Sequence, residues 1–513
     1  MIKLLKQEII GVVLGLTPWI IMGIFLLPRI TFGSENLRIL EAMPIGRDQA
    51  HVAGVMWGGW KTGAPMFYST YGYLYYNISW WVLRIISLFI PITEQLIIIV
   101  LRSLNLFSFL GIGFFSYFWV RKRLSVVYAL FYSLLFFALF QNNDFILRTT
   151  VVQPDMINMF AIVIAFFTAL DLALNYSRKQ LIISAITLGV IMSIKYVGFI
   201  FLPLIVFIIY LHKRRLKVII RLTTLYFFIF LLTFGILSSH SLFRLEFVKS
   251  LLFVKNAFLH YNGGPLIWLK FIWYDTLGLL FTILFIAENI FFLSQYFRIP
   301  KKKLNTYQLF SIIWTWFVII FLLIFTKSVT HRYFYPTLPA IIFVITFAVI
   351  NIISIFRKKM IFISLILFIL LLNSAYLIKR EYLNTANNYS CLECNSGIQV
   401  GRWLEKNINI DAKILWDEYE YIPYKFQNNL LLPSGNPKLH YKKFVPDIII
   451  IQGSYIRYIN SLDNEDYDEI YYEKAKVVKK FYEELIQNRL PYQQIAIFGN
   501  EKTNNDILIF EKN

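Results

Sequence analysis

The stretch LIISAITLGVIMSIKYVGFIFLPLIVFIIYL, residues 181–211, decides how many times this chain crosses a membrane. It is apolar over more than the roughly 20 residues that one spanning helix needs, and Lys195 interrupts it near its middle. As one span, it would place every later cluster of basic residues on the opposite side of the membrane from the earlier clusters. Two short helices that meet at Lys195 near the outer face keep all the clusters on one side, as expected of cytoplasmic loops. We therefore predict two helices.

The rest of the chain is equally apolar. Hydrophobic residues make up 58% of the 513 positions and charged residues 16%, whereas about a quarter of the residues in soluble proteins are charged. We predict a polytopic α-helical membrane protein with about eleven transmembrane helices and additional interfacial helices. The first span ends near Pro28, and the others follow at roughly 95–120, 124–141, 153–174, 181–195, 196–211, 218–238, 276–296, 308–326, 334–356 and 360–378.

The net charge of +20 lies in the membrane part of the chain. Residues 1–378 contain 33 basic and 11 acidic side chains, whereas residues 379–513 contain 17 and 19. The cations punctuate apolar spans instead of lining one face of a folded domain, so we expect membrane lipids and no nucleic acid as partners. With eleven spans, the basic loops share the cytoplasmic side with Lys3 and Lys6. We predict an integral multi-pass protein of the plasma or inner membrane, with an uncleaved cytoplasmic N-terminus.

Two long loops then lie outside, at 29–94 and 239–275. Within the first, residues 71–90 are apolar enough to span but rich in Tyr and Trp, so they form either a span or a helix in the outer interface. We prefer the interfacial helix, because it keeps Arg121–Arg123 in the cytoplasm. In the second loop, apolar residues at near-helical spacing over 243–258 predict another interfacial helix.

Residues 379–513 lose the long apolar runs and predict a soluble extracytoplasmic α/β domain. Its expected helices and strands lie at 399–408 and 468–488, and at 413–416, 447–452, 495–498 and 506–510. The two cysteines of the chain, Cys391 and Cys394, also lie here. A CxxC pair forms a disulfide or half of a metal site, and no second Cys or His pair accompanies this one. We therefore prefer a local disulfide, or two inert thiols, to a zinc site.

Polar and aromatic side chains gather in the first outer loop, in the stretch GRDQAHVAGVMWGGWKTGAPMFYSTYGYLYY, residues 46–76. Asp48 lies in its polar segment GRDQAH, and Asp155 lies in RTTVVQPDM at the mouth of a later span. Acids are costly near a bilayer, so both are candidates for a functional role. The alternatives are structural: Asp48 can pair with Arg47 at a helix start, and Asp155 after Pro154 can be an acid favoured by the helix dipole.

In their order along the chain, these features resemble those of the GT-C membrane glycosyltransferases, in the branch of the protein O-mannosyltransferases and the aminoarabinose transferases of lipid A. The shared order is an apolar helix, an acid with a following helical stretch, a Gly-Trp turn and a Tyr-rich segment leading into an interfacial helix. Three later segments also resemble that branch: LRTTVVQPDMINMF from Leu147, SIKYVGFIFLPL from Ser193 and HRYFYPTLPA from His331. The resemblance covers roughly residues 1–360.

The resemblance implies a glycosyltransferase that moves a hexosyl or pentosyl group from a polyprenyl-phosphate donor to an acceptor at the outer face, with inversion. Asp48 would be the general base that removes the acceptor proton. Lys195 and Arg332 would hold the leaving phosphate. The remaining residues implied to assist the phosphate or to contact substrate are Arg47, Lys61, His331, Gln49, Tyr71 and Tyr73.

The same resemblance gives Asp155 two alternative roles: it would either bind a divalent metal cation together with Asp48 or orient a substrate hydroxyl. The branch usually shows Asp-Glu in its first loop, whereas this chain has Asp48-Gln49. Glutamine can hydrogen-bond a sugar but supplies no second charge. The loop therefore offers one acid where the branch has two. No nucleotide cofactor is expected, because the chain has no Gly-rich phosphate loop.

Two other classes of protein compete with a transferase. A transporter or flippase for a lipid-linked glycan predicts internal repeats and ionisable residues near mid-bilayer, and neither is evident in the sequence. A non-catalytic membrane scaffold gives no reason for acids and cations to gather at the same span mouths. Single residues also have structural alternatives, since Lys195 can snorkel to the interface and Arg332 can anchor a span end. The sugar is left open, and the acceptor can be a lipid, a glycan or a protein.

Overall fold

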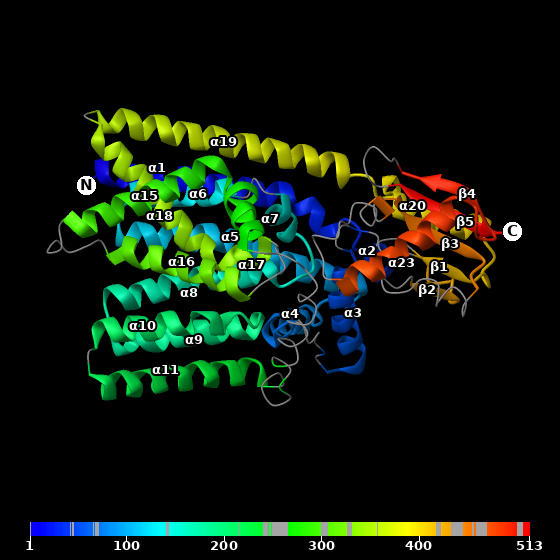
Figure 1. The fold of residues 1–513 in the computed structure, drawn as a ribbon, viewed down its shortest axis with the longest axis horizontal. Helices are drawn as coiled ribbons and strands as arrows, with labels where there is room; N and C mark the ends of the chain where they lie inside the picture. Colours follow the sequence, from blue (N-terminus) through cyan, green and yellow to red (C-terminus); the bar gives the residue numbers. More distant parts are fainter. Residues whose placement is uncertain are drawn as a thin grey trace.

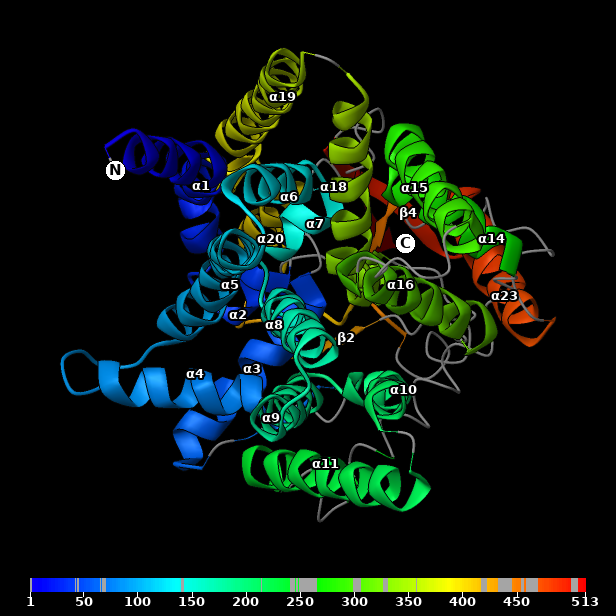
Figure 2. The ribbon, with the colours of Figure 1, turned by 90° about the vertical axis from the view of Figure 1, so that its left-hand side faces the viewer.

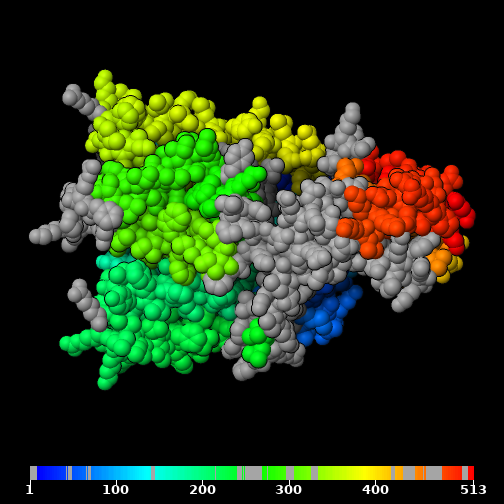
Figure 3. All heavy atoms as spheres, viewed as in Figure 1, coloured from blue at the N-terminus to red at the C-terminus, as the bar shows by residue number. Residues whose placement is uncertain are grey.

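The computed structural model describes most of the chain. The described residues are 2–41, 43, 46–64, 66, 71–139, 143–213, 215–239, 245, 248, 265–298, 306–325, 331–356, 358–416, 422–431, 445–453, 456–457, 469–499 and 506–513. They form a bundle of long helices with a smaller α/β domain at one end (Figure 1). The space-filling view shows the α/β domain projecting from that end of the bundle (Figure 3).

Eleven of the described helices coincide with the eleven predicted spans. They are α1 (Ile2–Thr31), α5 (Glu94–Arg123), α6 (Val126–Ala138), α8 (Asp155–Leu174), α9 (Arg178–Ile194), α10 (Leu202–His212), α11 (Leu216–Leu237), α15 (Gly278–Arg298), α16 (Thr306–Phe325), α18 (Leu338–Ile355) and α19 (Lys359–Asn388). Within the described part of the chain, eight of them are long and apolar enough to cross a membrane, and α6 and the segment Gly198–His212 are shorter apolar helices. The prediction of a polytopic helical protein is confirmed.

Burial separates the centre of the bundle from its edge. The apolar parts of α8 and of the helix Tyr335–Ile355 are each 72% buried, whereas that of α19 is 11% buried. Aromatic rings fill the centre, where Phe343 of α18 contacts Tyr132, Phe166 and Phe167. A helix that is apolar all round belongs at the centre of such a bundle, and one with few protein contacts lies at its edge facing lipid.

The break at Lys195 is present in the structure. Helix α9 ends at Ile194, and Lys195 has an extended backbone that closes the helix through its N–H to the carbonyl of Ile191. A 3-10 turn, η2 (Gly198–Phe201), then leads into α10, whose second residue is a proline. Proline fixes a helical φ and needs no N–H partner at a helix start. The prediction of two short helices that meet at Lys195 is therefore confirmed.

Two short helices lie across the end of the bundle instead of along it. They are α3 (Gly46–Thr62) and α4 (Tyr73–Ile86). Helix α4 is seen nearly end-on in Figure 1, where the long helices run lengthwise, and side-on in Figure 2, which looks along the bundle. With 14 residues, α4 is also shorter than the roughly 20 residues of a spanning helix. Of the two alternatives for residues 71–90, the structure has the interfacial helix and not the span.

The start of α4 is held against the Lys195 break by backbone contact. The N–H of Gly72 donates to the carbonyl of Ile194 at 2.9 Å, and the hydroxyl of Tyr196 donates to the carbonyl of Tyr71 at 3.3 Å. A Cβ added at Gly72 would overlap the carbonyl oxygen of Ser193. Only glycine allows this approach of two backbones.

We therefore expect Gly72→Ala to destabilise the protein by about 1–3 kcal/mol, because the overlap is with backbone that cannot rotate away. The measurement is the thermal unfolding midpoint of the detergent-purified protein. Gly54→Ala is the matched control, since a Cβ there meets only Leu37 Cδ1 at 3.7 Å. Equal midpoints for both variants would show that the contact at Gly72 is not needed.

The C-terminal domain is built on a mixed five-stranded sheet of strand order β2-β1-β3-β5-β4. The strands are β1 (Ile414–Trp416), β2 (Asn429–Leu431), β3 (Ile448–Gln452), β4 (Tyr492–Phe498) and β5 (Ile507–Lys512). Strand β1 pairs in parallel with β2 and β3, and β5 pairs antiparallel with β3 and β4. Apolar residues of α20 (Ser396–Asn407) pack with one set of strand residues, and those of α23 (Glu469–Ile486) pack with the other. The α/β prediction is confirmed.

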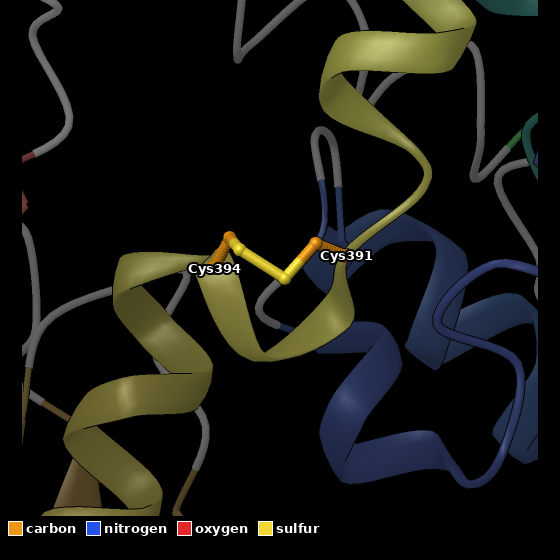
Figure 4. The surroundings of a disulfide bond; sticks show 2 residues. All are labelled: Cys391 and Cys394. Atoms are coloured by element: carbon orange, nitrogen blue, oxygen red, sulfur yellow. A yellow bond between two sulfur atoms is a disulfide. The ribbon is translucent and has the colours of Figure 1, made fainter.

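The junction between bundle and domain contains the two cysteines. Cys391 and Cys394 form a disulfide across the short turn η5 (Leu392–Cys394), between α19 and α20 (Figure 4). Of the alternatives for the CxxC pair, the structure has the local disulfide. The boundary predicted at residue 378 falls inside α19, which continues to Asn388.

The second long loop is only partly described. The interfacial helix predicted over 243–258 lies outside the described residues except at Leu245 and Val248. The loop ends in α14 (Pro265–Lys270) and a π-helix, η3 (Phe271–Thr276), which lead into α15.

Candidate functional site

A buried carboxylate at the start of α8 brings two cations together. The side chain of Asp155 is 1% exposed, and its Oδ1 lies 2.6 Å from Nζ of Lys195. Its Oδ2 lies 3.4 Å from Nη1 of Arg148, which also donates to Gln153 Oε1. One buried carboxylate thus contacts two cationic side chains. We call Arg148, Asp155 and Lys195 the cation pair site.

The sequence explains how these residues meet. Arg148 ends α7 (Asn143–Arg148), and Asp155 begins α8 after Pro154, so the turn between the two helices brings them together. Lys195 comes from the break between α9 and α10, where no helix geometry constrains its direction. Its side chain is 14% exposed, and its Nζ lies 5.9 Å from the ring of Tyr71 in the first loop. The cation pair site therefore lies beside the first loop, at the end of the bundle that α3 and α4 cross.

Gln49 ties α3 to the turn before Asp155. Its side chain is buried, and its Oε1 accepts a hydrogen bond from the N–H of Val152 at 2.9 Å and two from Arg102, at Nε and Nη2, each at 3.4 Å. This contact holds the first turn of α3 against the residues that precede Asp155. Asp48 is the neighbour of Gln49 on that turn. The predicted base therefore has its backbone next to the cation pair site.

Two residues of α5 that the sequence analysis did not single out complete this arrangement. Nη1 of Arg102 donates to the carbonyls of Arg29, Ile30 and Phe32 at the end of α1, at 3.1, 3.1 and 2.6 Å. Asn105 donates to the carbonyls of Val151 and Gln153 at 2.6 Å each, and it is fully buried. The sequence does contain a signal for Arg102 and Asn105, because both are polar residues inside an apolar helix. Such a side chain is costly to bury unless it has hydrogen-bond partners.

The end of α1 also contacts the last part of α19, residues 379–388. Arg29 forms a buried ion pair with Glu381 at 2.9 Å and donates to the hydroxyl of Thr385 at 2.8 Å. Farther along the chain, the hydroxyl of Tyr424 donates to Glu94 at 3.3 Å. Burial, with the Glu94 carboxylate beside it, raises the pKa of Tyr424 to about 12, so this hydroxyl keeps its proton at neutral pH. The C-terminal domain is thereby fixed to the loop region that surrounds the site.

The other predicted site residues are spread over this end of the bundle. Tyr71 is buried beside Lys195, and Tyr73 is half-buried at the start of α4. Lys61 is exposed at the far end of α3, where its Nζ lies 4.6 Å from the ring of Trp57.

Four predicted residues are described only by their backbone. Arg47 and Asp48 lie in the first turn of α3, and His331 and Arg332 lie in α17 (His331–Phe334). The turn that follows α17 packs against α8, and Tyr335 in it contacts Phe145 of α7 at 5.2 Å between ring centroids. Helices α3 and α17, which carry these residues, lie toward the same end of the bundle as α7 (Figure 1).

The donor groups around Asp155 fit an orienting role better than metal binding. Both of its oxygens lie beside cationic side chains, and an ammonium and a guanidinium compete with a divalent ion for the same lone pairs. Among the described residues, no three His, Cys, Asp or Glu side chains gather in one place. The side chain of Asp48, the other predicted metal ligand, lies outside the described ones. We assign no step of the reaction to a metal.

Comparison with known proteins identifies the fold. No protein-family model matches the sequence, and no curated protein matches it. In structure, the chain is similar to ArnT from Cupriavidus metallidurans in its apo state, with a TM-score of 0.52, 13% identity, and coverage of 96% of this chain and 98% of ArnT. For ArnT bound to undecaprenyl phosphate, the TM-score is 0.51 and the identity 12%, with the same coverage.

At this identity, the similarity to ArnT is one of fold. The similarity extends over both the helical bundle and the α/β domain, because it covers nearly all of both chains. The expected fold, a multi-pass membrane bundle with a C-terminal α/β domain, is confirmed.

Proposed function

We propose that this chain is a glycosyltransferase that moves a sugar from a polyprenyl-phosphate donor to an acceptor at the outer face of the membrane. The observation that carries the proposal is the buried Asp155 that holds Lys195 and Arg148 together at the end of the bundle. It lies in a fold shared over 96% of the chain with a transferase whose crystal structure contains undecaprenyl phosphate. Lys195 and Arg148 are cations of the kind that bind the oxygens of a phosphate group.

In the proposed reaction, the acceptor attacks the anomeric carbon of the donor sugar from the face opposite the phosphate, which inverts the configuration. The bond between that carbon and the phosphate oxygen breaks, and polyprenyl phosphate leaves with the bonding electrons. Asp48 accepts the acceptor proton. Lys195 holds the charge of the leaving phosphate, with Arg332 as a second cation. Asp155 fixes the position of Lys195, which reduces the reorganisation needed when charge develops.

The experiment that tests this function uses purified protein in lipid nanodiscs, a polyprenyl-phosphate donor with a radiolabelled sugar, and an acceptor extract of the cell envelope. We expect the label to leave the lipid and unsubstituted polyprenyl phosphate to appear, only when the extract is present. A set of donors with different sugars identifies the one transferred. If the label stays on the lipid with every donor but moves between leaflets in vesicles, the protein is a flippase and the proposal is wrong.

The proposed outer position of the C-terminal domain can be tested with the native cysteines, because Cys391 and Cys394 are the only two in the sequence. We expect a membrane-impermeant maleimide to label this protein on intact cells only after treatment with an impermeant reductant, because the disulfide must first be reduced. The control is Cys391→Ser/Cys394→Ser, which should take no label. Labelling that requires permeabilised cells would place the domain in the cytoplasm.

A further inference from the structure

A second cationic group lies where α3 meets α4. The rings of Trp60 and Trp80 are 5.2 Å apart, and the guanidinium of Arg84 lies 5.0 and 4.9 Å from their centroids. One turn before Trp60, the ring of Trp57 supports Nζ of Lys61 at 4.6 Å. We call these five residues the cationic tryptophan cluster. The start of α4, at Tyr73, lies beside the Lys195 break and therefore beside the cation pair site. Arg84 lies eleven residues farther, about 16 Å along α4, so the cluster is separate from that site.

The cluster has donors and positive charge but no anion. Lys61 and Arg84 are both exposed, and no carboxylate pairs with either within the part of the chain that the structure describes. The indole Nε1 of Trp57 is buried and has no hydrogen-bond partner among the described residues. A buried N–H without an acceptor is unfavourable. It faces the interior and not the two exposed cations, and these cations are the groups that a phosphate would pair with.

The neighbouring surface indicates where that phosphate comes from. Trp81 and Ile85 are 68% and 61% exposed, and they lie near Arg84 on the surface of α4. Leu88, in the turn after α4, is 78% exposed. Phe89 in the same turn is 81% exposed. The opposite face of α4 is buried against the protein. Since α4 lies across the bundle end (Figures 1 and 2), we expect this apolar face to lie at the depth of the lipid headgroups and upper acyl chains.

We propose that the cationic tryptophan cluster binds the headgroup phosphate of an anionic membrane phospholipid, whose acyl chains lie along the exposed face of α4. The phosphate is held between Lys61 and Arg84. The lipid would connect α4 to the end of α3, the helix that begins with the predicted base. This site is independent of the proposed transfer reaction, because it requires only that α4 lies at the membrane surface.

The test is native mass spectrometry of the detergent-purified full chain titrated with phosphatidylglycerol or with phosphatidylcholine. We expect the anionic lipid to bind more tightly. Each cation near a membrane surface contributes about fivefold in affinity, so Lys61→Gln/Arg84→Gln should bind phosphatidylglycerol roughly thirtyfold more weakly. Lys61→Arg/Arg84→Lys keeps both charges and should retain most of the binding. Lys270→Gln removes an exposed cation outside the cluster and should change nothing.

Several results would overturn the proposal. Equal binding of the two lipids by the wild-type chain would remove the case for an anionic headgroup. Unchanged binding by Lys61→Gln/Arg84→Gln, or an equal loss with Lys270→Gln, would show that the cluster is not the site. Displacement of the lipid by glycerol 1-phosphate at the same concentration would show that the site takes a free phosphate and not a lipid.

Discussion

Replacing Lys195 with methionine is expected to lower the rate of sugar transfer by about 10²–10³, the usual effect of removing one fixed donor from a site where negative charge develops. Nζ of Lys195 lies 2.6 Å from a carboxylate that is 1% exposed, so the ammonium is held in place before the donor binds. Methionine keeps the length and apolar character of the side chain and removes only the charge. The measurement is the transfer rate at saturating and at limiting donor, which separates donor binding from the chemical step.

A structural role of the same residue would give a different pattern. Removing Lys195 alone leaves the buried Asp155 with Arg148 as its remaining cation in the cation pair site, and a buried acid that loses a partner destabilises the fold. The double variant Lys195→Met/Asp155→Asn removes the acid as well and should recover the thermal unfolding midpoint. We expect transfer by the double variant to stay low. Recovery of both stability and transfer would show that Lys195 serves only to neutralise Asp155.

Asp48→Asn is the second change with a large expected effect. It should reduce transfer by about 10²–10⁴, the contribution typical of a general base. Donor binding should stay near that of the wild type, because asparagine keeps the size and hydrogen-bonding capacity of the side chain at the first turn of α3. The measurement compares transfer rate with the retention of labelled donor on the purified protein.

The matched control is Glu35→Gln, which neutralises an exposed acid in the same loop. It should transfer sugar at the wild-type rate. Normal transfer by Asp48→Asn would remove the base from the proposed mechanism, and the same loss in both variants would indicate a general effect of loop charge.

The helical bundle could be predicted because its physics is local. A spanning helix needs a long apolar run. The expectation that basic loops lie in the cytoplasm then decides whether such a run is one span or two. That logic placed the break at Lys195, where α9 ends at Ile194 and η2 begins at Gly198. It also favoured an interfacial α4, whose buried face includes Tyr75, Tyr76 and Trp80.

Other features depend on contacts that no local pattern contains. The charged residues after 378 indicated the end of a span, but charged residues also form helices. Helix α19 continues to Asn388, and its Glu381 pairs with Arg29 at the end of α1. No strand was predicted at β2, which is defined by its parallel pairing with β1.

The candidate site was predictable in part. Asp155 and Lys195 were both named from the sequence, since acids and cations at span mouths are costly without a function. Their mutual ion pair was not, because they lie 40 residues apart and meet only through the packing of α8 against α9. Gln49 was assigned to substrate by position in a motif, and the structure shows its Oε1 engaged by Arg102 and Val152.

The central claim is that the cation pair site holds the phosphate of a lipid donor, and a structure of this protein with bound polyprenyl phosphate tests it most directly. We expect a phosphate oxygen within hydrogen-bonding distance of Nζ of Lys195, with the lipid chain leaving toward the bilayer beside the bundle. If the phosphate binds elsewhere, and the ion pair between Lys195 and Asp155 is unchanged and makes no contact with it, the cation pair site is not the phosphate site.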